Sequence, residues 1–136
     1  MTMLLHKELS YRLIGAVIQV RKDFGLGHKE SLYQNALAKE LKRQKIPFER
    51  EKDIRIYNPR TGEFTGTYQP DFVIDNKIIV EIKAQEFVSH KVIDQLYDYL
   101  RNSEYELGYF LNFGERRFHP KRIIYTNDRK DWRRLK

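Results

Sequence analysis

The segment from Gln69 to Lys83 constrains the fold most strongly, because a turn cluster separates two strongly apolar arms. If Ile74 pairs with Ile78 across the three residues between them, the two arms form a β-hairpin. One face of that hairpin is then entirely apolar and carries Phe72, Ile74, Ile78, Val80 and Ile82. The second arm is apolar enough to lie centrally in a sheet.

The other face of the same hairpin carries charge. In this register Asp71 lies directly opposite Glu81, and Lys83 joins their face by the two-residue period of a strand. Two carboxylates about 4 Å apart repel each other by roughly 4 kcal/mol at an effective dielectric constant of 20. A domain of marginal stability would not keep such repulsion for packing reasons. We therefore expect a cation between the two carboxylates.

Two kinds of cation suit this position. Lys83 alone could serve as a structural counterion. Alternatively, Asp71, Glu81 and a backbone carbonyl such as that of Ile82 hold Mg²⁺ or Mn²⁺, which take oxygen ligands and keep coordination sites for water and a phosphate. In this second interpretation Lys83 orients or helps to deprotonate the attacking water, while the metal activates that water and stabilises the leaving oxygen.

Apolar periodicity predicts the elements around the hairpin. Spacings of three and four residues predict helices at about 4–24, 29–45 and 89–101, the last capped by Ser89. Alternating or apolar runs predict strands at about 54–57, 65–74, 78–83, 105–113 and 122–126. This order predicts an α/β or α+β fold, in which helices cover a mixed β-sheet.

Composition indicates one domain over residues 1–136. The chain is 40% hydrophobic, which suffices for one core, and it contains no cysteine. Disulfide scaffolds, zinc fingers and thiol nucleophiles are therefore excluded. Charged residues interrupt the apolar stretch from Leu4 to Phe24, so it is neither a membrane span nor a signal peptide. We expect a soluble, cytoplasmic protein that binds no membrane.

The net charge of +7 is concentrated in a basic C-terminal segment, residues 114–136. Besides Lys136 its basic residues are Arg116, Arg117, Lys121, Arg122, Arg129, Lys130, Arg133 and Arg134. A basic segment beside a nearly neutral body is typical of contact with a polyanion, so these eight are candidate nucleic-acid-binding residues. The alternative is a solvated surface that favours solubility. Trp132 in this segment either stacks on a base or anchors the segment to its own domain.

Three motifs resemble those of the PD-(D/E)XK nuclease superfamily and follow one another along the chain in the order expected for it. The run Pro70-Asp71, followed after nine residues by Glu81-Ile82-Lys83, resembles its signature. The run from Gly27 to Tyr33 is similar to the GxxExxY motif, which names a small bacterial and archaeal protein family in that superfamily. The run from Gln95 to Tyr99 resembles the Q-x-x-x-Y helix of the RecB-like exonuclease branch.

This resemblance implies a restriction-endonuclease-like core and Mg²⁺-dependent hydrolysis of phosphodiester bonds. Asp71 and Glu81 would be metal ligands and Lys83 the catalytic lysine. Glu30, in an early helix, would reach the metal or its waters; by itself it is equally a first-turn carboxylate that favours the helix dipole.

The same resemblance assigns roles to Gln95 and Tyr99, while residue type and position assign roles to Gly27 and Tyr33. Gln95 and Tyr99 would lie beside the active site and contact the nucleic acid, although such a pair one turn apart is also typical of an amphipathic boundary. Gly27 would supply a left-handed or tight backbone conformation, and Tyr33 would pack with its hydroxyl tied to the site.

Three functional hypotheses remain. The leading one is a metal-dependent nuclease that cleaves DNA in preference to RNA. The second is a non-catalytic nucleic-acid-binding or protein-interaction module on the same fold, which the intact Asp, Glu and Lys set disfavours. The third is a hydrolase of small phosphodiesters or nucleotides, whose binding would depend little on salt. Homodimerisation would suit a cutter of double strands.

Overall fold

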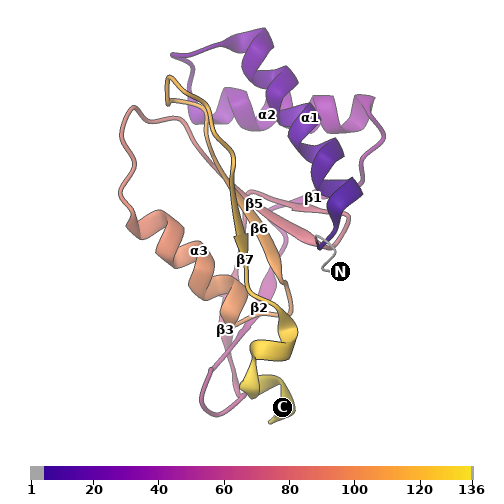
Figure 1. Cartoon of the computed structure of the whole chain (residues 1–136), viewed down its shortest axis with the longest axis vertical. Helices are drawn as coiled ribbons and strands as arrows, with labels where there is room; N and C mark the ends of the chain where they lie inside the picture. The colour runs from indigo at the N-terminus through magenta and orange to yellow at the C-terminus, as the bar shows by residue number, and fades with distance from the viewer. Residues whose placement is uncertain (1–4, 136) are drawn as a thin grey trace.

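The computed structural model describes residues 5–135 and shows a mixed β-sheet with helices on both faces (Figure 1). The helices are α1 (Lys7–Phe24), α2 (Glu30–Arg43) and α3 (Lys91–Arg101). The strands are β1 (Phe48–Arg50), β2 (Ile54–Tyr57), β3 (Phe64–Tyr68), β4 (Phe72–Ile74), β5 (Ile78–Lys83), β6 (Leu107–Asn112) and β7 (Lys121–Ile124). Two short 3₁₀ helices follow, η1 (Asn127–Arg129) and η2 (Asp131–Arg134).

The main sheet has five strands in the order β1-β4-β5-β6-β7. Strands β5 and β6 run parallel and the other neighbours antiparallel. Helix α3 connects the parallel pair, as a parallel pair requires a crossover. Strands β2 and β3 form a separate two-stranded sheet. The predicted class, a mixed sheet flanked by helices, is confirmed.

The central hairpin has the predicted register. Ile74 pairs with Ile78 and Phe72 pairs with Val80, so the residues that precede β4 face the end of β5. Its turn is closed by Asp75 and Asn76 in the left-handed region, with φ of 48° and 53°. Asp and Asn tolerate that conformation better than most residues. The turn therefore places Asp71 opposite Glu81.

Each face of the sheet has its own apolar cluster, because successive strand residues point to opposite sides. On the face of α1 and α2, residues such as Leu13 and Tyr33 pack on the apolar face predicted for the hairpin. On the face of α3, Leu96 and Leu100 pack on the alternate strand residues, which include Ile79. Among residues 5–135 no helix is long and apolar enough to cross a membrane.

The single strand predicted over residues 65–74 is wrong. Strand β3 ends at Tyr68, and β4 begins only at Phe72. Pro70 lies between them and has no N–H to continue a ladder. Strand β3 pairs instead with β2, where Ile54 lies opposite Tyr68. This break carries Tyr68 to the α3 side of the sheet, against the second apolar cluster.

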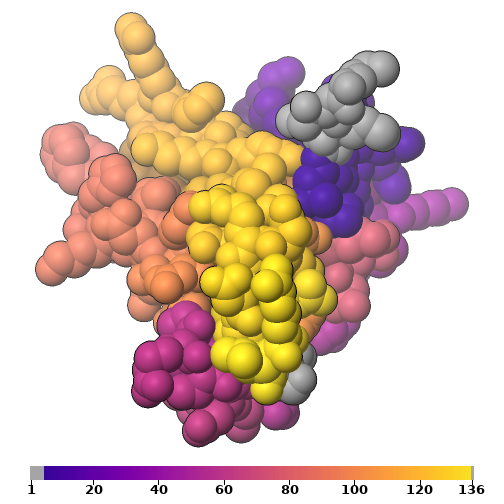
Figure 2. Space-filling view, turned by 60° about the horizontal axis from the view of Figure 1, so that its bottom comes forward, coloured from indigo at the N-terminus to yellow at the C-terminus, as the bar shows by residue number. Residues whose placement is uncertain are grey.

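The C-terminal segment folds back onto the body of the protein and covers part of its surface (Figure 2). Trp132 is 1% exposed, stacks on Tyr57 with ring centroids 4.7 Å apart, and donates its Nε1–H to the carbonyl of Arg101 at 2.7 Å. A Cβ at Gly62 would lie only 2.9 Å from the Trp132 carbonyl oxygen. The contacts of Trp132 thus follow the second interpretation, an anchor for its own domain.

Candidate functional site

Asp71 and Glu81 lie next to each other on the α3 face of the sheet, both partly buried. Oδ2 of Asp71 accepts a hydrogen bond from the backbone N–H of Ile82 at 2.7 Å. Oε1 of Glu81 accepts one from the backbone N–H of Asp71 at 3.1 Å. Each carboxylate is thus fixed to the strand that carries the other, whereas within residues 5–135 nothing donates a hydrogen bond to Asp71 Oδ1 or Glu81 Oε2.

The two carboxylates are short of compensating charge. Burial, and after it the charge of Asp71, raise the pKa of Glu81 to about 7. Burial likewise raises the pKa of Asp71 above its usual range. Lys83 opposes both shifts without cancelling either. A lysine counterion alone therefore does not balance this pair, and a further cation would.

Lys83 ends β5 on the same face as Glu81 and is half-buried. Its carbonyl accepts a hydrogen bond from the N–H of Phe113 at 2.8 Å, which fixes the backbone at this point. Within residues 5–135 its side chain forms no hydrogen bond or ion pair. The amine is therefore held beside the carboxylates but left available.

Tyr68 completes the site, and the sequence analysis missed it. Its hydroxyl donates to Glu81 Oε1 at 2.6 Å. Burial and the charge of Glu81 raise the pKa of Tyr68, so the phenol keeps its proton. In the sequence, the one feature that points to Tyr68 is weak: it is an aromatic residue just ahead of Pro70 and Asp71.

Tyr68 also joins the predicted Gln95 and Tyr99 to the carboxylates. The rings of Tyr68 and Tyr99 stack with centroids 3.6 Å apart and an interplanar angle of 9°. The amide of Gln95 donates to the Tyr99 hydroxyl at 3.3 Å. The structure thus brings both residues of α3 to the edge of the site, one ring away from Glu81.

Glu51 is a second residue that the sequence analysis missed. The pairing of Arg50 with Phe72 continues to Glu51 beside Asp71, and the N–H of Glu51 donates to the Asp71 carbonyl at 3.4 Å. Its charge raises the pKa of Asp71. Glu51 therefore adds to the negative potential at the pair.

The structure does not bring Glu30 to the two carboxylates. Its Oε2 accepts a hydrogen bond from Gln34 at 3.3 Å in the first turn of α2. Residues 5–135 contain no group of three or more His, Asp or Glu side chains that could hold a metal ion. Glu30 thus occupies the position of a carboxylate that favours the helix dipole.

The other motif residues around Glu30 fix α2 to the end of β5. Gly27 has a φ of 91°, which favours glycine. Tyr33 donates its hydroxyl to the Gly25 carbonyl at 2.6 Å and stacks on Phe113 with centroids 4.6 Å apart. Because Phe113 bonds to the Lys83 carbonyl, Tyr33 supports the site from the opposite face.

The exposed basic residues of the C-terminal segment form two groups. The turn group, which is Arg116, Arg117 and Lys121, lies in the β6–β7 turn and at the first residue of β7, at the end of the sheet where Lys83 lies. The tail group, which is Arg129, Arg133 and Arg134, lies beyond the end of β7, at the other end of the sheet (Figure 1). Lys136 lies outside the described residues.

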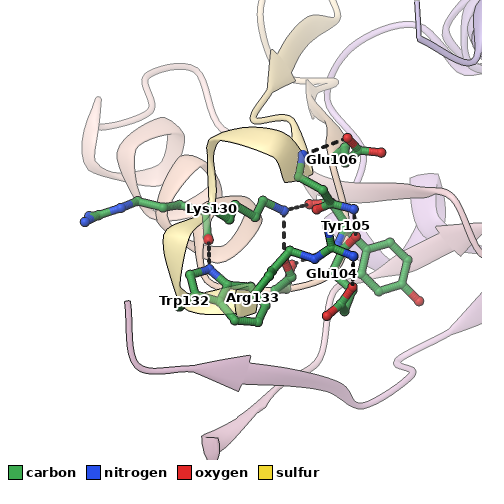
Figure 3. A network of polar contacts seen from close by, with 9 residues as sticks. Glu104, Tyr105, Glu106, Lys130, Trp132 and Arg133 are labelled. Carbon is green, nitrogen blue, oxygen red and sulfur yellow. Dashed lines mark hydrogen bonds and ion pairs between the residues drawn. The ribbon is translucent and has the colours of Figure 1, made fainter. Parts of the chain in front are cut away.

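Two of the residues predicted to contact nucleic acid have side-chain partners within the protein. Lys130 is 3% exposed and donates to the carbonyls of Ser103 and Tyr105, both at 2.7 Å (Figure 3). Arg122 donates to the Tyr109 hydroxyl at 2.7 Å and to the Leu5 carbonyl at 2.8 Å. Both side chains hold the protein together. The expectation of contact with nucleic acid is corrected for Lys130, which is buried, whereas Arg122 is half-buried. The sequence marks them only as charged, whereas their partners are remote along the chain.

The comparisons with known proteins return one family. A model described as the PD-(D/E)XK nuclease superfamily matches residues 7–123. This range includes Asp71, Glu81, Lys83 and all of α3, and it ends in β7, before the 3₁₀ helices η1 and η2. No curated protein and no solved structure matches the chain.

Proposed function

We propose that this chain, which belongs to the PD-(D/E)XK nuclease superfamily, is a metal-dependent nuclease that hydrolyses phosphodiester bonds of nucleic acid, DNA in preference to RNA. One observation carries the proposal. Two adjoining carboxylates, Asp71 and Glu81, have raised pKa values and unused oxygens beside the available amine of Lys83. Packing does not account for such an arrangement, whereas catalysis of phosphoryl transfer does.

The donor set fits Mg²⁺ or Mn²⁺. Carboxylate and carbonyl oxygens are the ligands that these cations prefer, and they commonly bind through one or two carboxylates plus waters and phosphate. Asp71 and Glu81 would hold the ion, with the backbone carbonyl of Ile82 as a third donor. When bound, the ion supplies a Lewis acid for the phosphate and lowers the pKa of a water molecule.

The remaining chemistry falls to side chains already in place. The Lys83 amine orients the attacking water and stabilises the charge that develops on the phosphate. The Tyr68 hydroxyl fixes the orientation of Glu81. Gln95 and Tyr99 present polar groups along α3 at the edge of the site, where a substrate strand would pass.

We propose that the turn group grips the nucleic-acid backbone next to the site, and that the tail group reaches only longer substrates. This division predicts different salt dependences. The double variant Arg116→Ala/Arg117→Ala should flatten the slope of log affinity against log salt concentration by about 1.8 for duplex DNA, at about 0.9 per phosphate contact. On a short duplex, Arg133→Ala/Arg134→Ala is the matched control, with the slope nearly unchanged. Equal slopes in the two variants would contradict this assignment.

The test of the proposed function is cleavage of labelled single-stranded, double-stranded and flap DNA, and of RNA, in Mg²⁺, Mn²⁺ or EDTA. We expect cleavage that requires metal and is lost in Glu81→Ala. Binding without cleavage across the whole panel would contradict the proposal and favour a non-catalytic nucleic-acid-binding module. Metal-dependent cleavage of nucleotides alone, with no salt dependence, would favour a hydrolase of small phosphodiesters.

A further inference from the structure

Phe87 is the most exposed of the large apolar side chains within residues 5–135, at 85%. It lies in the loop of residues 84–90 that connects β5 to α3, four positions after Lys83. At no more than about 3.6 Å per residue, the two Cα atoms are within about 14 Å of each other. An aromatic ring is thus presented to solvent close to the proposed cleavage site.

The start of this loop is fixed. The side chain of Asn112, 4% exposed, accepts a hydrogen bond from the Gln85 N–H at 3.0 Å and donates one to the Gln85 carbonyl at 2.8 Å. Gly114 presses against the same residue, since a Cβ there would lie 2.5 Å from the Gln85 backbone. Phe87 therefore follows a clamped residue.

The end of the loop is fixed as well. Val88 packs against the apolar cluster beneath α3. The Ser89 hydroxyl accepts a hydrogen bond from the N–H of Lys91 at 3.2 Å, at the start of the helix. Phe87 projects from a short span between two anchors, so the backbone around it is set before any ligand binds.

The surroundings of Phe87 suit a nucleic acid better than a protein surface. Its sequence neighbours Gln85, Glu86, Ser89 and His90 are exposed and polar, and the adjacent Val88 is half-buried, so the ring stands among polar side chains of its own loop. The clamp at Gly114 places the β6–β7 turn, with exposed Arg116 and Arg117, beside the loop. An exposed ring near basic side chains matches the stacking platforms that bind single strands.

We propose that Phe87 stacks on an unpaired base of the strand that is cut, so that the substrate is single-stranded at the point of cleavage. The inference rests on the proposed function for the position of the cleaved bond. A base inside a duplex is covered by its neighbours, whereas an unpaired base offers a free face. Because every base has such a face, the contact selects unpaired strands and does not select a base sequence.

The test measures binding rather than cleavage, in the Glu81→Ala background without metal. Anisotropy of a labelled single strand and of a blunt-ended duplex without a loop gives the two affinities, and 2-aminopurine in the strand reports stacking on its base. Phe87→Ala should weaken single-strand binding at least about fivefold, the low end of one stacking contact, and should abolish 2-aminopurine quenching. Duplex affinity should change less than about twofold.

Two matched variants complete the experiment. Phe87→Trp should keep both the affinity and the quenching. Tyr11→Ala removes a ring that is similarly exposed, at 81%, but lies on α1, and it should change neither. Equal losses for both substrates, or no loss, would overturn the inference. So would sedimentation showing that Phe87→Ala abolishes self-association and leaves single-strand binding intact.

The outcome is separable from that of the proposed function. If the wild-type protein cleaves no substrate but Phe87→Ala still loses single-strand binding and quenching, the stacking site stands and the nuclease proposal fails. If cleavage occurs but Phe87→Ala binds as the parent does, the nuclease proposal stands and the stacking site fails.

Discussion

Two clusters of buried charge lie toward opposite ends of the sheet, and they differ in how the protein completes them. At one end Lys130 donates to two backbone carbonyls, and the charges of Glu106 and Glu104 partly offset the effect of burial on its pKa. At the other end Asp71 and Glu81 face each other. The charge of Asp71 raises the pKa of Glu81, and the charge of Glu51 raises the pKa of Asp71. In the first cluster, which we call complete, the Lys130 amine has two hydrogen-bond acceptors within the protein, although burial still lowers its pKa to about 8. The second lacks positive charge, which is the condition of a site that binds a cation.

The largest expected effect comes from the lysine at the incomplete cluster. Lys83→Met should slow cleavage at least about a hundredfold, because the amine that orients water and stabilises phosphate charge is lost. The free energy of unfolding should fall only modestly. Within residues 5–135 the amine forms no hydrogen bond or ion pair, and its charge offsets only part of the rise in the pKa values of Asp71 and Glu81. Cleavage kinetics and thermal unfolding of the same preparation check both statements. Wild-type cleavage by Lys83→Met would remove Lys83 from the mechanism.

The same substitution at the complete cluster should have the opposite outcome. Lys130→Met keeps the volume but leaves the carbonyls of Ser103 and Tyr105 without their donor, at a cost of about 2–4 kcal/mol in the free energy of unfolding. Urea unfolding measures this loss. The cleavage rate per folded molecule should stay within about twofold of wild type. A stable Lys130→Met protein would show that the C-terminal anchor does not depend on this contact.

A smaller effect is expected at Tyr68. Tyr68→Phe keeps the ring stacked on Tyr99 and removes only the hydrogen bond to Glu81. A bond to a charged group contributes about 1.5 kcal/mol or more, which corresponds to roughly a tenfold lower cleavage rate. The metal concentration for half-maximal rate should rise, because Glu81 is less well oriented. Tyr11→Phe, which removes a phenol hydroxyl from an exposed ring on α1, is the control and should cleave as the wild type does.

The pH dependence of stability should separate the two clusters in metal-free buffer. The pKa of Glu81 is about 7 in the folded protein and 4.5 otherwise, so the folded state binds more protons and stability falls as pH rises from 4.5 to 7. The pKa of Lys130 is about 8 instead of 10.5, so the unfolded state binds more protons and stability rises from pH 8 to 10.5. Urea unfolding across this range should show Glu81→Gln losing the first slope and Lys130→Met the second. If the variants keep the pH dependence of the wild type, Glu81 and Lys130 do not cause the two changes of stability with pH.

The hairpin and its carboxylate pair were predictable because they depend on local pattern. Alternation over residues 72–82 determines which side chains share a face, and the short turn determines the register. Asp71, Glu81 and Lys83 follow from these two properties alone. The helices follow for the same reason, since their apolar spacing repeats over many residues.

Tyr68, Lys130 and Arg122 were not predictable in the same way, because their positions depend on remote contacts. Tyr68 reaches Glu81 only because the chain leaves the main sheet at Pro70 and β3 pairs with β2. Lys130 and Arg122 belong to a basic run, and their acceptors lie far away in the sequence. From its charge alone, a basic side chain is expected to face solvent. Whether it can be buried depends on hydrogen-bond acceptors that only the folded structure brings near it.

The most direct test of the central claim is the melting temperature of wild type and Glu81→Gln, each in EDTA and in Mg²⁺. If the carboxylate pair exists to bind a cation, Mg²⁺ should raise the melting temperature of the wild type by mass action. In EDTA, Glu81→Gln should melt at or above the wild-type temperature, because repulsion with Asp71 is gone, and it should lose the Mg²⁺ effect. A Glu81→Gln protein that is less stable in EDTA, or that responds to Mg²⁺ as the wild type does, would contradict the account.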